Sequence, residues 1–333
     1  FKLFKRDALA SRVGDAGVSQ VLTDAEGAVL LGDLATPLMV AEIGQDGGAV
    51  DFVDTGPEDP AVLIYTSGTT GTPKGILQTH AMRAAQMDRV TPNGYDDHAR
   101  TLLSTPLYSN TTIVSFMPTL FGGSTVYLMP KFDARGYLEI VEQEKITHTM
   151  LVPVQYKRIM DVPDFDRFDL SSMRVKFSTS APLRADVKRD VLARFPGKLI
   201  EYYGLTEGGG VTVLVASDHP DKLHTVGAHV PNSDIRLIDD AGREVPLGDV
   251  CEIFGRSPTM IAGYFGRDVL TEEYIWRKSD GEVYGRSGDM GRFVEDGFLI
   301  RSDRKKDMLI SGGLNIYADD LERALLADPD VED

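Results

Sequence analysis

The feature that most limits what this chain can fold into is a loop of small and hydroxylated residues that follows a short apolar segment. The apolar segment is 61–64, and residues 65–75 read Tyr-Thr-Ser-Gly-Thr-Thr-Gly-Thr-Pro-Lys-Gly. Four apolar residues in a row predict a short buried strand. The loop after them has little side-chain bulk and many free backbone N–H groups, and Lys74 adds one positive charge. Such a loop is suited to holding a polyphosphate.

Two other interpretations of this loop are available. Glycine-, serine- and threonine-rich stretches after strands are often plain turns. A P-loop phosphotransferase would need a lysine that follows glycine and precedes serine or threonine. Here Pro73 precedes Lys74 and Gly75 follows it, so the P-loop interpretation fails.

Composition limits the class of protein. A chain of 333 residues, with 42% hydrophobic and 26% charged residues, predicts a globular protein of two or three domains. Its net charge of −16 argues against nucleic-acid partners and against binding to anionic membranes. Cys251 is the single cysteine, which excludes an internal disulfide. No apolar run is long enough for stable membrane insertion, and residues 1–6 are too short and basic for a secretory signal. We therefore expect a cytoplasmic protein, and a homodimer stays open.

The order of predicted elements favours an α/β fold. Strands and helices alternate up to about residue 210, which is typical of layered subdomains with mostly parallel sheets. From about residue 211, short strands separated by turns predict a β-rich, distorted-barrel subdomain. Residues 29–58 are rich in turn formers and predict surface loops. We therefore expect an α/β portion over 1–210, a β-rich subdomain over 211–302, and a hinge with the start of another domain over 303–333.

Residues 202–207, Tyr-Tyr-Gly-Leu-Thr-Glu, form a second candidate ligand loop. They follow a predicted strand, where α/β sheets place ligands. Tyr203 offers a flat face for a purine and Thr206 a hydroxyl for a phosphate. Glu207 offers a carboxylate to Mg²⁺, which binds a few carboxylates together with substrate phosphates. Taken alone, Glu207 would more often be a solvated turn residue than a metal ligand.

Six motifs in this order resemble those of the adenylate-forming superfamily. They are residues 65–75, 105–110, 178–183, 202–207, 284–291 and 301–317. This superfamily includes acyl-CoA and aryl-CoA synthetases, amino-acid adenylation domains and luciferases. The resemblance implies the large domain of an acyl-CoA synthetase. It also implies ATP, Mg²⁺ and CoA as cofactor and co-substrates, and a small carboxylic acid as the other partner.

The resemblance assigns a role to residues of each motif. It implies that the nucleotide contacts are Thr66, Ser67, Gly68, Thr69, Thr70, Lys74, Ser180, Ala181, Pro182, Tyr202, Tyr203, Gly204, Thr206, Asp289 and Arg304. Asp289 is the implied ribose ligand, and a carboxylate is an apt acceptor for a vicinal diol. The implied acyl pocket is Tyr108, Ser109, Asn110, Ser180, Gly208 and Gly209. The implied hinge and CoA passage are Lys306, Gly312 and Gly313, and the implied catalytic residues are Thr206, Glu207 and Lys74.

The implied reaction has two steps, adenylation of the acid by ATP and transfer of the acyl group to a thiol. Gly208 and the two glycines after it suggest space for a medium-length, long or aromatic acid. The stretch 108–112 lacks the aspartate that an amino-acid adenylation domain would need, and a non-catalytic nucleotide-binding module stays a further alternative. Ser109 and Asp303 depart from the superfamily pattern, in which histidine and glycine are usual. The superfamily's adenylation lysine is expected beyond Asp333, so we expect an impaired fragment of a longer enzyme.

Overall fold

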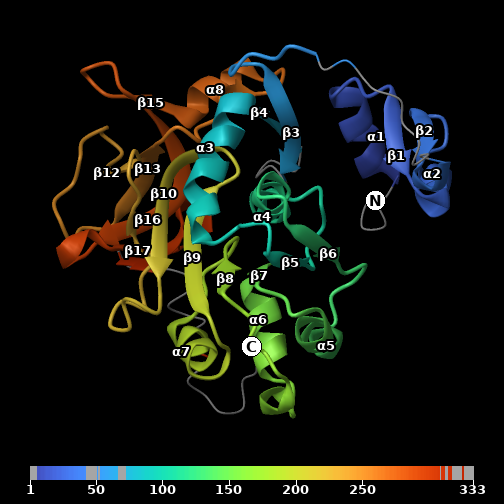
Figure 1. Ribbon diagram of the computed structural model, residues 1–333. Coiled ribbons are helices and arrows are strands. Elements are labelled where there is room, and N and C mark those ends of the chain that lie inside the picture. Colours follow the sequence, from blue (N-terminus) through green and yellow to red (C-terminus); the bar gives the residue numbers. More distant parts are fainter. Residues whose placement is uncertain are drawn as a thin grey trace. The chain divides into compact units, whose positions relative to one another are not determined.

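A computed structural model describes residues 6–42, 51, 53–66, 73–307, 309–311, 314–316 and 325 of the chain (Figure 1). Packing divides the chain into two compact units. The first unit is Phe1–His80 together with Ala262–Asp268, and the second is Ala81–Ile261 together with Val269–Asp333. These units group the chain by packing and cut across the three regions predicted from sequence, so that three-part division stays a prediction.

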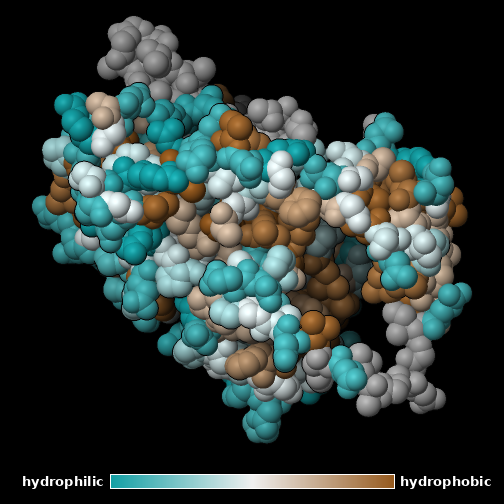
Figure 2. Space-filling view, turned by 90° about the horizontal axis from the view of Figure 1, so that it is seen from above, coloured by the Kyte–Doolittle hydropathy of each residue, from teal (hydrophilic) through white to brown (hydrophobic). Residues whose placement is uncertain are grey.

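The first unit begins with a small α/β layer. It consists of α1 (Arg6–Asp15), β1 (Gln20–Thr23), α2 (Ala25–Leu31) and β2 (Thr36–Met39), with β1 and β2 parallel. Our expectation of surface loops over 29–58 is wrong for the first third of that range, where α2 ends and β2 forms. The Asp24 side chain caps α2 by accepting a hydrogen bond from the Gly27 N–H (2.8 Å), and Leu31 is buried. Leu22, Val29 and Val40 are exposed, and Figure 2 shows brown, apolar groups on this part, at the right of the view.

The same unit contains a three-stranded antiparallel sheet in the order β14-β4-β3. Its strands are β3 (Pro60–Thr66), β4 (Lys74–Thr79) and β14 (Gly263–Tyr264). The predicted alternation of strands and helices would place a helix directly after the phosphate loop. This is wrong, because a second strand, β4, stands between the loop and the next helix. Ile76 of β4 is fully buried, and such burial favours a strand even in a segment of only six residues.

The second unit is built on a seven-stranded sheet in the order β11-β10-β9-β8-β7-β5-β6. Its strands are β5 (Arg100–Leu103), β6 (Thr125–Leu128), β7 (His148–Leu151), β8 (Val175–Ser178), β9 (Lys198–Leu205), β10 (Gly208–Val215) and β11 (Ala228–His229). The strands from β6 to β9 are parallel, and β10 and β11 are antiparallel additions. The predicted parallel α/β sheet is therefore confirmed.

Helices cover both faces of this sheet. They are α3 (His80–Val90), α4 (Asn110–Phe121), α5 (Ala134–Glu144), α6 (Pro153–Met160) and α7 (Ala185–Arg194). Neighbouring strand residues point to opposite faces. Leu151 and Leu199 pack with residues of α5, α6 and α7, whereas Met150 and Ile200 pack with residues of α3 and α4. The result is a three-layer α/β/α arrangement.

A second sheet, curled into a half-barrel, belongs to the same unit. Its strands run in the order β12-β13-β16-β15, and β17 pairs with the far part of β16. They are β12 (Asp234–Ile238), β13 (Cys251–Arg256), β15 (Ile275–Arg277), β16 (Val283–Phe293) and β17 (Leu299–Arg304), with the short helix α8 (Asp268–Tyr274) before β15. This sheet confirms the predicted β-rich subdomain, although the sequence had not indicated β16 as a strand.

The chain continues through a short hairpin of β18 (Leu309–Ser311) and β19 (Leu314–Ile316). The rest of the region in which we expected another domain to begin, residues 317–333, lies outside the described residues, apart from Leu325. Among the residues described, no helix is both long and apolar enough to span a bilayer.

Candidate active site

The buried carboxylate of Asp289 is the centre of the polar cluster on the curled sheet. Only 2% of Asp289 is exposed. The Tyr203 hydroxyl donates to Asp289 Oδ2 (3.0 Å), and Arg301 Nη2 donates to Oδ1 (3.2 Å). Arg304 Nε lies 3.6 Å from Oδ1, and its side chain is 46% exposed. The carboxylate is thus held by one phenol and two cations, one of which is open to solvent.

Strand register explains this cluster. The antiparallel pairing of β16 with β17 places Arg304 opposite Asp289. Tyr203 comes from β9, in the other sheet, so the cluster joins the two sheets of the second unit. Arg301 was not among the residues predicted for the site. The only sequence signal for it is a cation on a strand, three residues before Arg304.

Local electrostatics fix the protonation of two of these groups. Burial, reinforced by the charge of Asp289, raises the pKa of Tyr203 well above its ordinary value, so the phenol remains a donor. Burial acts to lower the pKa of Arg301, but attraction and hydrogen bonding to Asp289 outweigh it, and the net shift is upward. At neutral pH the Tyr203 phenol therefore stays neutral and Arg301 stays a cation.

The two adjacent tyrosines of the 202–207 motif face opposite ways. Tyr203 points to Asp289, whereas the Tyr202 ring stacks on Phe177 with 5.6 Å between ring centroids. The guanidinium carbon of Arg89, in α3, lies over the Tyr202 ring, 6.0 Å from its centroid. Tyr202 thus packs among the residues under α3 and α4. Its assignment as a nucleotide contact stays a prediction.

The predicted ligand loop at 202–207 is not a loop throughout, which corrects our expectation. β9 continues through Leu205, and Thr206 and Glu207 form the turn of a β9–β10 hairpin. The Glu207 carbonyl accepts from the Ile261 N–H (2.9 Å). The turn is therefore tied to the segment before β14, and the strand continues because the parallel sheet is extended by an antiparallel partner.

The first two glycines after Glu207 pack closely against the backbone of another segment. Gly208 and Gly209 have φ of +72° and +73°. A Cβ on Gly208 would lie 1.6 Å from the Thr259 carbonyl oxygen. A side chain at Gly208 would therefore collide with the backbone of residues 259 and 260, and the assignment of Gly208 and Gly209 to the acyl pocket stays a prediction.

The segments 108–111 and 178–183 meet at Ser180. Its hydroxyl lies 2.5 Å from that of Thr111, and its φ is +79°, an unusual conformation for serine. Ser109 precedes α4 as its N-cap residue, and Asn110 begins the helix. Asn110 Oδ1 is buried and has no hydrogen-bond partner among the described residues. Tyr108 is about half exposed, and Ala181 and Pro182 are exposed. The structure thus brings the predicted acyl-pocket segment next to the 178–183 loop.

Of the predicted phosphate loop, only the ends are described. Thr66 and Lys74 face each other across the β3–β4 pairing. Lys74 Nζ lies 5.1 Å above the centre of the Tyr264 ring, so its charge is placed by a cation–π contact. Ser67, Gly68, Thr69 and Thr70 lie outside the described residues, as do Gly312 and Gly313. Lys306 is exposed in the 3₁₀ turn Lys305–Asp307 after β17.

Comparison with known proteins identifies the family. Residues 3–265 match the family model described as AMP-binding enzyme. The chain belongs to the AMP-binding enzyme family. This AMP-binding chain is 33% identical, over 96% of its length, to a feruloyl-CoA synthase of Amycolatopsis. It is 33% identical, over 84% of its length, to a medium/long-chain fatty acid–CoA ligase of Mycobacterium tuberculosis.

The fold of the AMP-binding chain agrees with solved members of this kind. The ATP-bound crystal structure of MatB from Rhodopseudomonas palustris has a TM-score of 0.86, with 28% identity. That comparison covers 98% of this chain and 67% of MatB. The chain spans 65% of the feruloyl-CoA synthase and 48% of the fatty acid–CoA ligase. The adenylate-forming fold expected from the motifs is confirmed.

The described residues could bind Mg²⁺ only together with ligands from water or from the substrate. Among the residues that the structure describes, no group of three or more His, Cys, Asp or Glu side chains could hold a metal ion. Glu207 at the hairpin turn could supply one carboxylate, and Mg²⁺ commonly takes its remaining ligands from water and substrate phosphates. The described residues therefore fit Mg²⁺ only together with substrate phosphates, and Glu207 as its ligand stays a prediction.

Proposed function

We propose that this chain carries the nucleotide- and acid-binding part of an enzyme that activates a carboxylic acid with ATP and transfers the acyl group to CoA. Membership of the AMP-binding enzyme family and the CoA-ligase relatives support acid activation and CoA ligation in general. The observation that supports it best in this chain is the Asp289 cluster. A buried carboxylate beside a half-exposed arginine is well suited to a ribose with a phosphate attached.

The proposed role of Asp289 follows from its unused bonding capacity. A carboxylate has about four lone-pair sites. Tyr203 and Arg301 take two of them by hydrogen bonds, and Arg304 lies beside a third. The remaining capacity suits the two hydroxyls of a ribose. Arg304 can then turn towards a phosphate, because nearly half of its side chain is exposed.

The proposed chemistry is the transfer of an adenylyl group to the acid, followed by the transfer of the acyl group to CoA. In the first, an oxygen of the substrate carboxylate attacks the α-phosphorus of ATP, the bond to the bridging oxygen breaks, and pyrophosphate leaves. In the second, the thiolate of CoA attacks the acyl carbon, and AMP leaves with the electron pair of the broken C–O bond. Positioning and charge stabilisation are the main demands on the protein. Mg²⁺, when bound, would neutralise phosphate charge beside Glu207.

Within this proposal, Lys74 and the loop from Thr66 would hold the leaving pyrophosphate, and Thr206 would contact a phosphate. The two relatives named above suggest an aromatic or a medium- to long-chain acid. The proposed partners are this acid, ATP and CoA, in the cytoplasm. Amino-acid adenylation and a non-catalytic nucleotide-binding module are the alternatives.

The test separates binding from chemistry. AMP binding to the 333-residue chain is measured by calorimetry, and acid-dependent exchange of pyrophosphate into ATP is measured with the natural full-length protein, with and without CoA. We expect AMP to bind and at least one aromatic or fatty acid to support exchange. Binding without exchange for any acid would favour the non-catalytic module, and exchange with amino acids alone would favour the other alternative.

A further inference from the structure

One carboxylate in the first unit joins three segments that are far apart in the sequence. The Tyr65 hydroxyl donates to Asp15 Oδ2 (2.6 Å), and Arg267 Nη2 donates to Asp15 Oδ1 (2.6 Å). Asp15 is the last residue of α1, Tyr65 lies near the end of β3, and Arg267 follows β14. The side chain of Asp15 is only 19% exposed, so the carboxylate is largely shielded from water. Asp15 therefore connects α1 to both β3 and the segment after β14.

The place of Asp15 in its helix does not account for a carboxylate. The C-terminal end of a helix carries a partial negative charge, which disfavours an acidic residue in the last turn. The two partners offset this cost, since one donates a hydrogen bond and the other carries a positive charge. Burial, followed by the hydrogen bond to Asp15 and its charge, raises the pKa of Tyr65 above its ordinary value, so the phenol keeps its proton and remains the donor. The contribution of Asp15 thus lies in these two contacts.

The first partner, Tyr65, lies at one end of the predicted phosphate loop. It directly precedes Thr66, and its neighbour across the β3–β4 pairing is Gly75, next to Lys74. A Cβ added to Gly75 would lie 3.2 Å from Tyr65 Cζ, the ring carbon that bears the hydroxyl, so the Tyr65 ring lies against the Gly75 backbone. The hydrogen bond to Asp15 therefore fixes a ring that contacts both strands where the loop leaves β3 and enters β4.

The second partner, Arg267, is tied to the other end of the loop. β14, which contains Tyr264, pairs with β4, which begins at Lys74. The centre of the Tyr264 ring lies 5.1 Å from Lys74 Nζ, and the Tyr264 carbonyl accepts from the Arg267 N–H (3.1 Å). The ion pair with Asp15 thus holds the turn that places Tyr264 beside Lys74.

We propose that Asp15 is a positioning residue for the two outer phosphates of ATP. Through its two partners it holds both ends of the phosphate loop, Thr66 and Lys74, in one geometry. The identity of the ligand rests on the proposed function, in which the loop from Thr66 holds the leaving pyrophosphate. Asp15 itself touches no substrate in this proposal, so it acts on a nucleotide only through the β- and γ-phosphates. AMP, which has neither phosphate, should be insensitive to Asp15.

The test compares ATP with AMP, because the two nucleotides differ only in the phosphates that Asp15 is proposed to affect. Binding of each to the 333-residue chain is measured by calorimetry with Mg²⁺ present, and the ratio of the two affinities is the readout. We expect Asp15→Asn to weaken ATP binding about fivefold, as for one lost hydrogen bond to a phosphate, and to leave AMP binding unchanged. Lys74→Gln, which removes a proposed phosphate contact itself, should weaken ATP binding about tenfold, again without an effect on AMP.

A second set of variants tests whether Asp15 acts through Tyr65. Tyr65→Phe removes only the hydroxyl that donates to Asp15, so it should lower the ratio of ATP to AMP affinity in the same direction. The double variant of Asp15→Asn and Tyr65→Phe should weaken ATP binding by less than the product of the two single effects, because both substitutions affect one contact.

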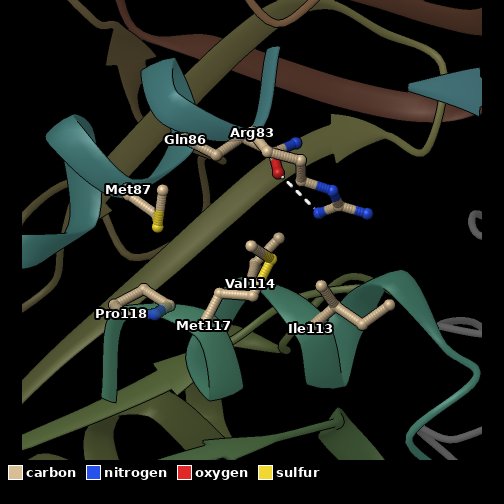
Figure 3. Close-up of a pocket in the computed structure, with 7 residues that line it drawn as sticks. All are labelled: Arg83, Gln86, Met87, Ile113, Val114, Met117 and Pro118. Carbon is tan, nitrogen blue, oxygen red and sulfur yellow. Dashed lines mark hydrogen bonds between the residues drawn. The ribbon is translucent and has the colours of Figure 1, made fainter. Parts of the chain in front are cut away.

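Two controls lie in the second unit. Asp234 accepts from the Tyr284 hydroxyl (2.6 Å) and pairs with Arg236 (2.8 Å), which is the same combination of partners. Asp234→Asn should therefore leave the ratio of ATP to AMP affinity unchanged. Gln86→Leu controls for a loss of stability, since it removes the acceptor of the buried Arg83 in a slot between α3 and α4 that is too narrow for a water molecule (Figure 3). It should lower the unfolding temperature without changing the ratio.

Several results would overturn the proposal. They are an unchanged ratio in Asp15→Asn, an equal weakening of ATP and AMP binding, or an equally large change of the ratio in Asp234→Asn. A changed ratio in Asp15→Asn with an unchanged one in Lys74→Gln would also overturn it, because Asp15 would then act elsewhere. If Asp15→Asn does not fold, an unchanged ratio in Tyr65→Phe overturns it.

Failure of the proposed function gives a different result. A wild-type chain that binds neither nucleotide refutes the nucleotide site of the proposed function and the role of Asp15 with it. If both nucleotides bind and the full-length protein exchanges pyrophosphate with an acid, an unchanged ratio in Asp15→Asn refutes only the positioning role. If the ratio depends on Asp15 but no acid supports exchange, only the proposed reaction is refuted.

Discussion

Two buried ion pairs in the second unit differ in what surrounds them. Lys188 and Glu201 are both about 2% exposed, and Lys188 Nζ lies 2.5 Å from Glu201 Oε2. Lys188 also donates to the carbonyls of Leu223 and Thr225. Glu201 Oε1 accepts from the Leu183 N–H, which anchors the 178–183 loop. This pair is closed on all sides by the protein.

The pair of Arg301 and Asp289 is open by comparison. Asp289 is buried, but Arg304 beside it is half exposed, and the carboxylate retains bonding capacity. A closed pair can only hold the fold, whereas an open pair can also bind a ligand. The comparison therefore predicts that substitutions at the first pair change stability and that substitutions at the second change nucleotide affinity.

The largest expected effect is on stability, from Glu201→Gln. It leaves the Lys188 ammonium buried without a counter-charge, which typically costs about 3–5 kcal/mol of the free energy of unfolding. Denaturant unfolding can be followed by the fluorescence of Trp276, which lies in the same unit and is the only tryptophan of the chain. Glu139→Gln, at an exposed position of α5, is the control and should change little. If Glu201→Gln lowers the free energy of unfolding by less than about 1 kcal/mol, the closed pair does not stabilise the fold as we expect.

The next effect is on binding, from Asp289→Asn. The amide keeps the shape but loses the charge, and hydrogen bonds to charged groups contribute about 1.5–3 kcal/mol. We therefore expect AMP to bind roughly ten- to a hundredfold more weakly by calorimetry. Asp296→Asn is a matched control, since Asp296 is an exposed aspartate paired with Lys222. Unchanged AMP affinity with a large loss of stability would place Asp289 among the closed pairs.

A smaller effect is expected from Arg304→Gln. Because 46% of its side chain is exposed, stability should change by no more than about 0.5 kcal/mol. AMP should bind several-fold more weakly, because one cation beside the ribose and phosphate is lost. Arg256→Gln is the control. Arg256 is equally exposed and paired with Glu282, but it does not contact Asp289. Equal AMP affinities for the two variants would remove Arg304 from the site.

Part of the fold and part of the candidate site could be predicted from the sequence alone. The parallel sheet was predictable because short strand segments such as Val175–Ser178 alternate along the chain with segments of helical periodicity. The strand β16 was not predictable, because Gly285, Gly288 and Gly291 interrupt its pattern of apolar residues. It forms through pairing with β13 and β17, and such pairing depends on residues far away in the sequence. The Asp289 and Arg304 assignments came from motif resemblance. Arg301 came only from the structure, because its contact with Asp289 depends on the pairing of β16 with β17.

The smallest expected effect concerns pH and a second closed group, His148. Its ring is buried, stacks on Tyr95 at 4.5 Å, and its Nε2 lies 3.0 Å from the Asn93 carbonyl oxygen. Burial lowers the pKa of His148 below its ordinary value. Below about pH 6.5 the unfolded chain then binds a proton that the folded chain does not. Stability should therefore fall as the pH drops below this value, and His148→Gln should reduce that dependence.

AMP affinity of the folded protein should not follow the same titration, since His148 lies outside the Asp289 cluster. Parallel changes in Trp276-monitored stability and in AMP affinity, both removed by His148→Gln, would mean that closed and open sites are coupled and that the distinction between them does not hold.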